Sequence, residues 1–211
     1  MKKLLIWGAG DQGLVTLDYA LMMKVYDQID FLKIKEKISR VIPDYNIYEE
    51  DENLETLFKL YDEVIVATGD NHLREQKIKK LNALHIPLAT IIHPSAIINS
   101  SAKVAQGSTI GAGAVININA FIGVGCIINT GAIVEHDCVI KDFVNICPGV
   151  AMAGHVTIAQ KSYLGIGATI IDDIHIGENV MIGAGAVVIE DIPDDSLAVG
   201  VPAKLKQRKT I

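Results

Sequence analysis

Hydrophobic residues recur at every sixth position through the second half of the chain. The series holds fifteen consecutive positions, and its members are Val104, Ile110, Ile116, Ile122, Ile128, Val134, Ile140, Ile146, Met152, Ile158, Leu164, Ile170, Ile176, Ile182 and Val188. A second, mostly small series lies two residues earlier, from Ala102 to Ala186. Neither an α-helix nor a simple strand has a period of six, whereas a solenoid of short parallel strands does. The glycine that often follows the aliphatic residue, as at Gly111 and Gly123, predicts a sharp bend there.

Residues 1–93 follow a different pattern, in which strand-like and helix-like segments alternate. Apolar runs predict strands at residues 3–7, 29–32, 63–68 and 88–94. Apolar residues at helical spacing predict helices over 14–23 and 71–84, the second with Asn71 as its N-cap. Such alternation predicts a small Rossmann-like parallel sheet with crossover helices. We therefore expect two domains, an α/β domain over 1–93 and an all-β solenoid over 94–211.

The composition narrows the functional classes. Half of the 211 residues are hydrophobic but only 5% are aromatic, so the core must consist of aliphatic and small side chains. The net charge of −6 argues against nucleic acid, because phosphate binding needs a basic excess. No apolar run reaches the roughly 18 residues of a membrane span, and the initial apolar run is too short for a signal peptide. The three cysteines lack metal or redox spacing, which favours a cytoplasmic protein with reduced thiols.

Three ionisable residues, Glu135, His136 and Asp137, interrupt the aliphatic repeats. They form either a solvated bend between strands or a catalytic cluster. Histidine is suited to general base catalysis near neutral pH, and an adjacent carboxylate can orient its ring. Gly154 lies 18 residues after His136, the length of one coil if each coil holds three hexapeptides. The position stacked on the candidate base would then carry no side chain, which leaves room for a ligand.

The repeats resemble those of the hexapeptide-repeat acyltransferases, which form a left-handed parallel β-helix with three hexapeptides per coil. More specifically, "IWGAGDQG", "VIVATGDNHLREQ", "ATIIHPSAIINSSAKV" and "GAIVEHDCVIKDFVNICPGVAMAGHVTI" resemble a subfamily of sugar acetyltransferases. This subfamily includes the acetyltransferase of the bacillosamine pathway, the perosamine N-acetyltransferase and the sialic-acid O-acetyltransferase type. The resemblance implies a cytoplasmic homotrimer that transfers acetyl from acetyl-CoA to the amine of a nucleotide-linked amino (dideoxy) sugar for surface glycans.

The resemblance also implies roles for individual residues. His136 matches the catalytic base, Asp137 the acidic residue that tunes it, and Asn129 an asparagine near the reacting amine. The positions expected to meet coenzyme A are Asn145, Gly154, Ile166, Gly183 and Ala184. The positions expected to meet the nucleotide sugar are Gly8, Gly10, Asp11, Gln12, Lys33, Gly69 and Asn71. The family's coenzyme site lies in a cleft between neighbouring β-helices.

Three positions depart from the family pattern. The family often has histidine at Gln12 and usually an acidic pair where Lys33 and Ile34 stand, so the nucleotide and the sugar stay open. It usually has histidine at Asn145, close to the acetyl group, and this change leaves His136 intact. Because the acceptor is open, O-acetylation of a sialic-acid-like sugar is an alternative, as is a non-catalytic partner in sugar biosynthesis.

Two further motifs have competing interpretations. "GAGDQG" is a GxGxxG match after a strand, but a domain of about 90 residues is too small for a full dinucleotide fold. We therefore expect it to bind the phosphates of a sugar nucleotide. His136, His155 and His175 are 19 and 20 residues apart, and they lack the close histidine pair of the γ-class carbonic anhydrases, so no metal is expected. Cys126 and Cys138 fall in the small inward series and are expected to pack in the core.

Overall fold

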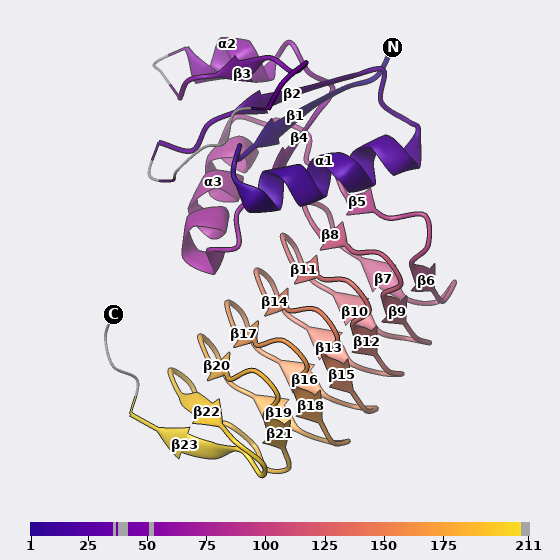
Figure 1. Ribbon diagram of the computed structural model, residues 1–211, viewed down its shortest axis with the longest axis vertical. Coiled ribbons are helices and arrows are strands. Elements are labelled where there is room, and N and C mark those ends of the chain that lie inside the picture. Colours follow the sequence, from indigo (N-terminus) through magenta and orange to yellow (C-terminus); the bar gives the residue numbers. More distant parts are fainter. Residues whose placement is uncertain (36, 38–41, 51–52, 208–211) are drawn as a thin grey trace. The chain divides into compact units, whose positions relative to one another are not determined.

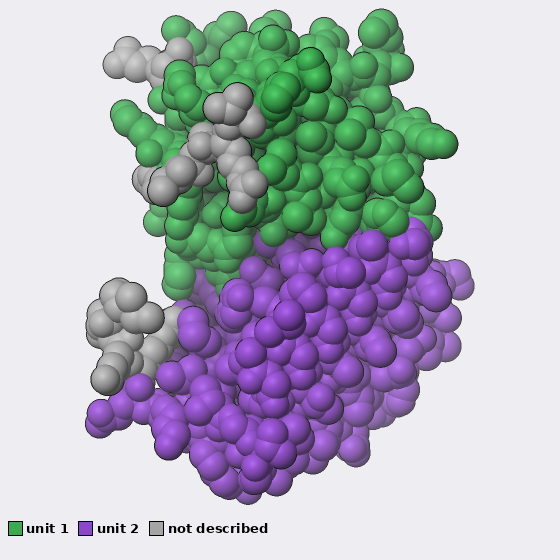
Figure 2. All heavy atoms as spheres, viewed as in Figure 1, with its two compact units in different colours: residues 1–94 green, residues 95–211 purple. Residues whose placement is uncertain are grey.

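The computed structural model describes residues 1–35, 37, 42–50 and 53–207. The chain divides into two compact units, Met1–Pro94 and Ser95–Ile211, which Figure 2 shows in green and purple. This boundary lies one residue after the one expected from the change in sequence pattern. In the described residues, no helix has both the length and the apolar character that crossing a membrane requires.

The first unit is built on a small parallel sheet, as the alternating pattern predicts. Its strand order is β3-β2-β1-β4 (Figure 1). The strands are β1 (Lys3–Trp7), β2 (Gln28–Leu32), β3 (Ile47–Tyr48) and β4 (Glu63–Val66), with a short β5 (Ile91–Ile92) at the end of the unit. The helices are α1 (Asp11–Met23), α2 (Leu54–Phe58) and α3 (Asn71–Ala83). The central strands are almost entirely buried, because both of their faces are covered.

One expectation for this unit is wrong, and one strand was not predicted. The N-cap of α3 is Asp70, whose carboxylate accepts a hydrogen bond from the backbone N–H of Leu73 at 3.0 Å. Asn71 is therefore the first helical residue, because the carboxylate one position earlier already satisfies a free amide of the first turn. Strand β3 was not predicted, because two paired residues are too few to produce a hydrophobic pattern.

The second unit is a solenoid of short parallel strands, as the six-residue period predicts, and it is the left-handed β-helix that the family resemblance implies. Its short strands are β6 (Ile97–Ile98), β7 (Lys103–Val104), β8 (Thr109–Ile110), β9 (Val115–Ile116), β10 (Phe121–Ile122), β11 (Ile127–Ile128), β12 (Ile133–Val134), β13 (Val139–Ile140), β14 (Asn145–Ile146), β15 (Ala151–Met152), β16 (Thr157–Ile158), β17 (Tyr163–Leu164), β18 (Thr169–Ile170), β19 (His175–Ile176), β20 (Met181–Ile182), β21 (Val187–Val188), β22 (Leu197–Val199) and β23 (Lys204–Lys206). From β6 to β18, each strand pairs in parallel with the strand 18 residues later, as Phe121 does with Val139. The stacked coils are visible in the lower part of Figure 1.

Both hydrophobic series point into this coil. The aliphatic positions from Ile110 to Val188 and the small positions from Ser108 to Ala186 are all buried. This series includes Cys126 and Cys138, which are fully buried. Both cysteines therefore pack in the core, as expected. A core without large aromatic side chains fits the narrow interior of the coil, and it explains the low aromatic content.

The sharp bends lie at different residues from those expected. The left-handed backbone conformation occurs three positions after each aliphatic residue of the series from Val104 to Ile182, for example at Gly113, Gly131 and His155. The glycines directly after the aliphatic residue serve close packing instead. A Cβ on Gly123 would lie 2.7 Å from the backbone nitrogen of Asp142 in the next coil. The glycines of the repeats therefore serve two separate purposes: some allow the left-handed turn, and others allow successive coils to approach closely.

Candidate active site

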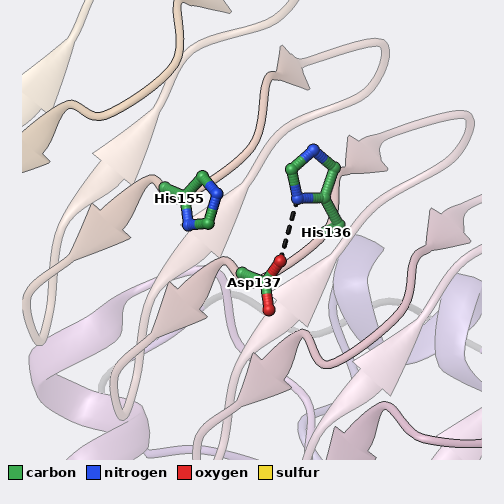
Figure 3. Close-up of side chains that lie close together, drawn as sticks. All are labelled: His136, Asp137 and His155. Carbon is green, nitrogen blue, oxygen red and sulfur yellow. Dashed lines mark hydrogen bonds and ion pairs between the residues drawn. The ribbon is translucent and has the colours of Figure 1, made fainter.

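The ionisable cluster lies on the bend that follows β12. Glu135, His136 and Asp137 come directly after this strand, and Gly154 and His155 occupy the corresponding bend after β15, one coil later. Asp137 and His155 both adopt the left-handed conformation, with φ of 59° and 60°. Two adjacent coils therefore present polar side chains at the same corner of the β-helix, as Figure 3 shows.

A hydrogen bond fixes the orientation of the His136 ring. Its Nδ1 lies 2.9 Å from Oδ2 of Asp137, and Oδ1 of the same carboxylate accepts a hydrogen bond from Nδ2 of Asn119 at 3.0 Å. The bond with His136, followed by that from Asn119, holds the pKa of Asp137 below its usual range. Because an ionised carboxylate can only accept, Nδ1 donates, and the neutral ring offers Nε2 as a proton acceptor.

Gly154 provides the space that the ring occupies. A Cβ at this position would lie 2.4 Å from Cε1 and 2.6 Å from Nε2 of His136. Contacts that short do not occur between side chains, so any larger residue here would displace the ring. The His136 side chain remains 47% exposed, so a substrate can reach it. The stacking of two adjacent coils thus places His136 and its partner Asp137 next to Gly154, whose missing side chain leaves room for the ring.

A second imidazole stands beside the first. The ring centroids of His136 and His155 lie 5.1 Å apart, and the rings are nearly perpendicular, at 85°. His136, Asp137 and His155 each offer a ligand atom, and these atoms lie within 4.8 Å of one another (Figure 3). His175, which the spacing of the histidines had grouped with these two, is not a member of this cluster in the described part of the chain.

The other residues expected on the β-helix lie on the outer wall of the coil or within it. Asn129 accepts a hydrogen bond from the neighbouring Thr130 N–H at 2.8 Å, a local bond outside the His136 cluster. Asn145 is buried in β14, whereas Ile166 is 58% exposed. Gly183 packs closely, since a Cβ there would lie 2.7 Å from Cγ1 of Val199. Ile166 and Ala184 are 18 residues apart and so occupy equivalent positions of successive coils.

The first unit contains a cavity of about 520 Å³ at the carboxyl ends of β1 and β4. Its lining consists of Gly8, Ala9, Gly10, Asp11, Gln12, Ile34, Lys37, Ala67, Thr68, Gly69 and Asp70. The helices α1 and α3 both begin at this lining, so their N-terminal amides provide a partial positive charge next to the cavity. Five of the seven residues expected to meet the nucleotide sugar line it, namely Gly8, Gly10, Asp11, Gln12 and Gly69.

Two expected residues do not line this cavity. The ammonium of Lys33 forms an ion pair with the carboxylate of Glu49, and the Asn71 side chain accepts a hydrogen bond from Arg74 at 2.8 Å. Lys37, which the sequence analysis did not identify, does line the cavity, with its Nζ 3.1 Å from Oδ2 of Asp70. Its side chain is 46% exposed. A basic residue on an irregular segment carries no pattern by which sequence alone could have distinguished it.

The glycines of "GAGDQG" have packing roles beside this cavity. Gly8 has φ of 139°, and a Cβ on it would lie 2.2 Å from the carbonyl oxygen of Ala67. A Cβ on Gly13 would lie 1.9 Å from the carbonyl oxygen of Gly8. The first and last glycines therefore let β1, α1 and the chain after β4 approach each other, which is how this motif places backbone amides near phosphate in other sheets.

Comparison with known proteins places this arrangement in a family. Residues 3–81 match the model of the PglD N-terminal domain, and residues 155–190 match that of the bacterial transferase hexapeptide repeats. A variant of perosamine N-acetyltransferase from Caulobacter crescentus, in complex with CoA and GDP-perosamine, is 32% identical over 99% of this chain and 98% of its own, with a TM-score of 0.92. This chain belongs to the PglD-type hexapeptide-repeat sugar acetyltransferases.

Other members and relatives agree with this placement. The acetyltransferase domain of PglB from Neisseria gonorrhoeae is 34% identical to this PglD-type chain, over 98% of it and 100% of that domain, with a TM-score of 0.91. The same domain is also known in complex with acetyl coenzyme A. Serine acetyltransferase from Synechococcus elongatus is 34% identical over 81 residues, and the match spans only a third of that enzyme's length.

Proposed function

We propose that the protein is an acetyl-CoA-dependent N-acetyltransferase that acetylates the amine of a nucleotide-linked amino sugar. The observation that carries this proposal is the hydrogen-bonded pair of His136 and Asp137 over the bare backbone of Gly154. This arrangement offers an oriented and accessible base. Direct transfer between two bound substrates is the chemistry that such a site serves.

In the proposed reaction, the neutral amine attacks the carbonyl carbon of the thioester with its lone pair. As the N–C bond forms, Nε2 of His136 removes one of the two protons of this nitrogen, which becomes the singly protonated nitrogen of the amide. The C–S bond then breaks, and the imidazolium returns the proton to the leaving thiolate of coenzyme A. Asp137 keeps Nδ1 protonated throughout and stabilises the imidazolium, as the carboxylate does in other histidine-base sites.

We place the nucleotide of the acceptor in the cavity of the first unit. The N-terminal amides of two helices and the ammonium of Lys37 can donate hydrogen bonds to a diphosphate there, beside the carboxylates of Asp11 and Asp70, which also line the cavity. The volume of about 520 Å³ lies within the range of small-molecule sites. The Caulobacter enzyme has been solved with GDP-perosamine, so guanosine diphosphate sugars are the first candidates for this chain.

We place coenzyme A against Asn145, Gly154, Ile166, Gly183 and Ala184. Asn145 lies in β14, Ile166, Gly183 and Ala184 follow the next strands of the same sheet, β17 and β20, and Gly154 lies on the bend after β15. The exposed Ile166 offers an apolar contact there, and the PglB domain has been solved with acetyl coenzyme A. We also propose a homotrimer, with the coenzyme between neighbouring β-helices. Each of the three sheets of the coil carries exposed apolar side chains that could contact a neighbouring subunit, for example Phe121 in β10, Ile133 in β12 and Met181 in β20. The mass in solution, measured by light scattering, tests this arrangement.

The test is turnover by the purified protein with acetyl-CoA and a panel of nucleotide-linked sugars. Amino sugars linked to GDP, UDP and dTDP are compared with matched sugars that carry a hydroxyl in place of the amine, and the acetylated product is identified by mass spectrometry. We expect N-acetylation of one amino sugar nucleotide. His136→Ala should melt like the wild type and lose about 10²–10⁴-fold in kcat. Near-normal turnover by this variant, or transfer to hydroxyl sugars alone, would refute the proposal.

A further inference from the structure

His155 has no part in the mechanism above, although it stands next to the proposed base. Its ring lies nearly perpendicular to that of His136, at 5.1 Å between centroids, and the carboxylate of Asp137 lies within reach of both (Figure 3). The three side chains come from two adjacent coils, and they gather because residues 137 and 155 occupy equivalent corners. Two imidazoles and one carboxylate facing a common space are a set of donors that transition-metal cations bind.

The geometry of the cluster is close to that of a zinc site. Zinc holds nitrogen and oxygen ligands at about 2.0–2.2 Å, so two ligands of a tetrahedral site lie roughly 3.4 Å apart. The donor atoms of His136, Asp137 and His155 lie within 4.8 Å of one another. The side chain of His136 is 47% exposed and that of Asp137 38% exposed, so both have room to close the difference by small rotations. Three protein ligands leave the remaining position open to solvent, as exposed zinc sites with three protein ligands do.

The hydrogen bonds of the cluster also suit a cation. The carboxylate of Asp137 is held by two of them, one with Nδ1 of His136 and one from Nδ2 of Asn119. The bond from Asn119 engages Oδ1 only, which leaves Oδ2 to change partner from His136 to a cation. Asn119 thus acts as an outer partner that fixes the carboxylate, an arrangement that strengthens metal sites.

We propose that His136, Asp137 and His155 form a binding site for a divalent transition-metal cation of the zinc type, and that an occupied site is inhibited. The inhibition rests on the proposed function, because a lone pair of the His136 ring that coordinates a cation cannot accept the proton of an amine. The binding itself does not depend on that function. The earlier expectation that no metal binds considered only the three-histidine pattern of 136, 155 and 175. The structure groups Asp137 with two of these histidines instead.

Binding is measured first, by isothermal titration of the full-length protein with Zn²⁺ in a buffer without chelators or thiols. We expect one saturable site per chain. His155→Asn should weaken binding at least about 10-fold, since even outer partners of a metal site contribute that much. Asparagine is the matched replacement, because it already adopts the left-handed conformation at the equivalent corner two coils earlier, Asn119. His175→Asn removes an exposed histidine outside the cluster and should leave the affinity unchanged.

Inhibition is measured second, as the initial rate with and without Zn²⁺, before free CoA accumulates, because its thiol also binds zinc. Each variant is compared with its own metal-free rate. We expect Zn²⁺ to inhibit the wild type and His175→Asn alike, and His155→Asn to need at least about 10-fold more metal. Three results with an active enzyme would overturn the inference and leave the proposed function standing. The wild type could bind no Zn²⁺, His155→Asn could bind Zn²⁺ as tightly as the wild type, or bound Zn²⁺ could leave the rate of the wild type unchanged. Zinc binding by a chain that acetylates no sugar would overturn the proposed function and leave the binding site standing.

Discussion

The substitution Gly154→Ala separates the role of the His136 ring from the stability of the coil. Gly154 has an ordinary backbone conformation, so alanine fits there without backbone strain. The added Cβ would lie 2.4 Å from Cε1 and 2.6 Å from Nε2 of His136. The nearest atoms therefore belong to a side chain that can rotate away, and none of them is a backbone atom. Carbon atoms prefer separations of about 3.5–4.0 Å, so the ring must move by roughly 1 Å or more.

The size of the effect follows from this displacement. A misplacement of about 1 Å at a reacting group can cost around 10²-fold in rate, which corresponds to about 2.7 kcal/mol of transition-state stabilisation. The ring is half exposed and can swing outward, so the melting temperature should change little. The assay is kcat with saturating acetyl-CoA and the amino-sugar nucleotide that the wild type acetylates in the panel, together with a thermal melt of each variant.

Gly165→Ala is the matched control. Its Cβ would lie 2.6 Å from the backbone nitrogen of Ala184 and 2.8 Å from the carbonyl oxygen of Ile182, neither of which can move without shifting a coil. This variant should lose roughly 1–3 kcal/mol of folding stability, as overpacked cores do. In the background of His136→Ala, Gly154→Ala should have no further effect on kcat, because the ring that it displaces is absent. If Gly154→Ala keeps normal turnover, Nε2 of His136 is not the proton acceptor in the described geometry.

Three further substitutions or measurements test other parts of the structure. Asp137→Asn should lower kcat less than His136→Ala does and leave both KM values nearly unchanged, since it removes only the orienting charge; equal losses would contradict this. Lys37→Ala should raise the KM of the nucleotide sugar about 10-fold, because it removes one charge-assisted contact, and should leave the KM of acetyl-CoA unchanged. Lys33→Ala should change neither KM, because the Lys33 side chain pairs with Glu49 outside the cavity. Burial raises the pKa of the Cys138 thiol to about 11. A thiol reagent at pH 8 should therefore label this residue only on unfolding, because roughly one thiol in a thousand is ionised, and rapid labelling of the native protein would refute the burial.

The β-helix could be predicted almost completely from sequence because its period is enforced at every repeat. Each aliphatic residue must point inward, and a shift of one residue would place it outside the coil. The six-residue series therefore determines strand positions to within a residue, as at Ile128 and Ile146. The bends were misplaced because glycine occurs for two reasons in the same repeat. Sequence shows that Gly123 and Gly125 are both glycines, but only the structure shows which one has positive φ.

The site was predicted only in part, for a related reason. His136 and Gly154 are exactly one coil apart, so their contact follows once the coil length is known. His155 was considered only as one of three histidines at spacings of 19 and 20, and its relation to Asp137, at 18, was overlooked. In the first unit, the cavity follows from the glycine motif and the two helix starts, whereas Lys37 and the pairing of Lys33 with Glu49 depend on an irregular chain path that has no periodic signal.

The composition of the corners offers a way to locate the active face of such a coil. The left-handed corner residues fall into three columns, each with an 18-residue spacing. One column consists only of glycine, from Gly113 to Gly185. Another carries a polar side chain at each of its positive-φ corners, and its members are Asn119, Asp137, His155 and Asp173. A residue with a Cβ costs roughly 1–2 kcal/mol in this conformation, least for asparagine, aspartate and histidine. Folding alone would favour glycine in all three columns, yet the third also carries side chains, at Phe143, Lys161 and Asn179. A side chain in this conformation therefore does not mark an active face by itself. The polar column stands apart because two of its members, Asp137 and His155, gather with His136 into one cluster of ionisable groups.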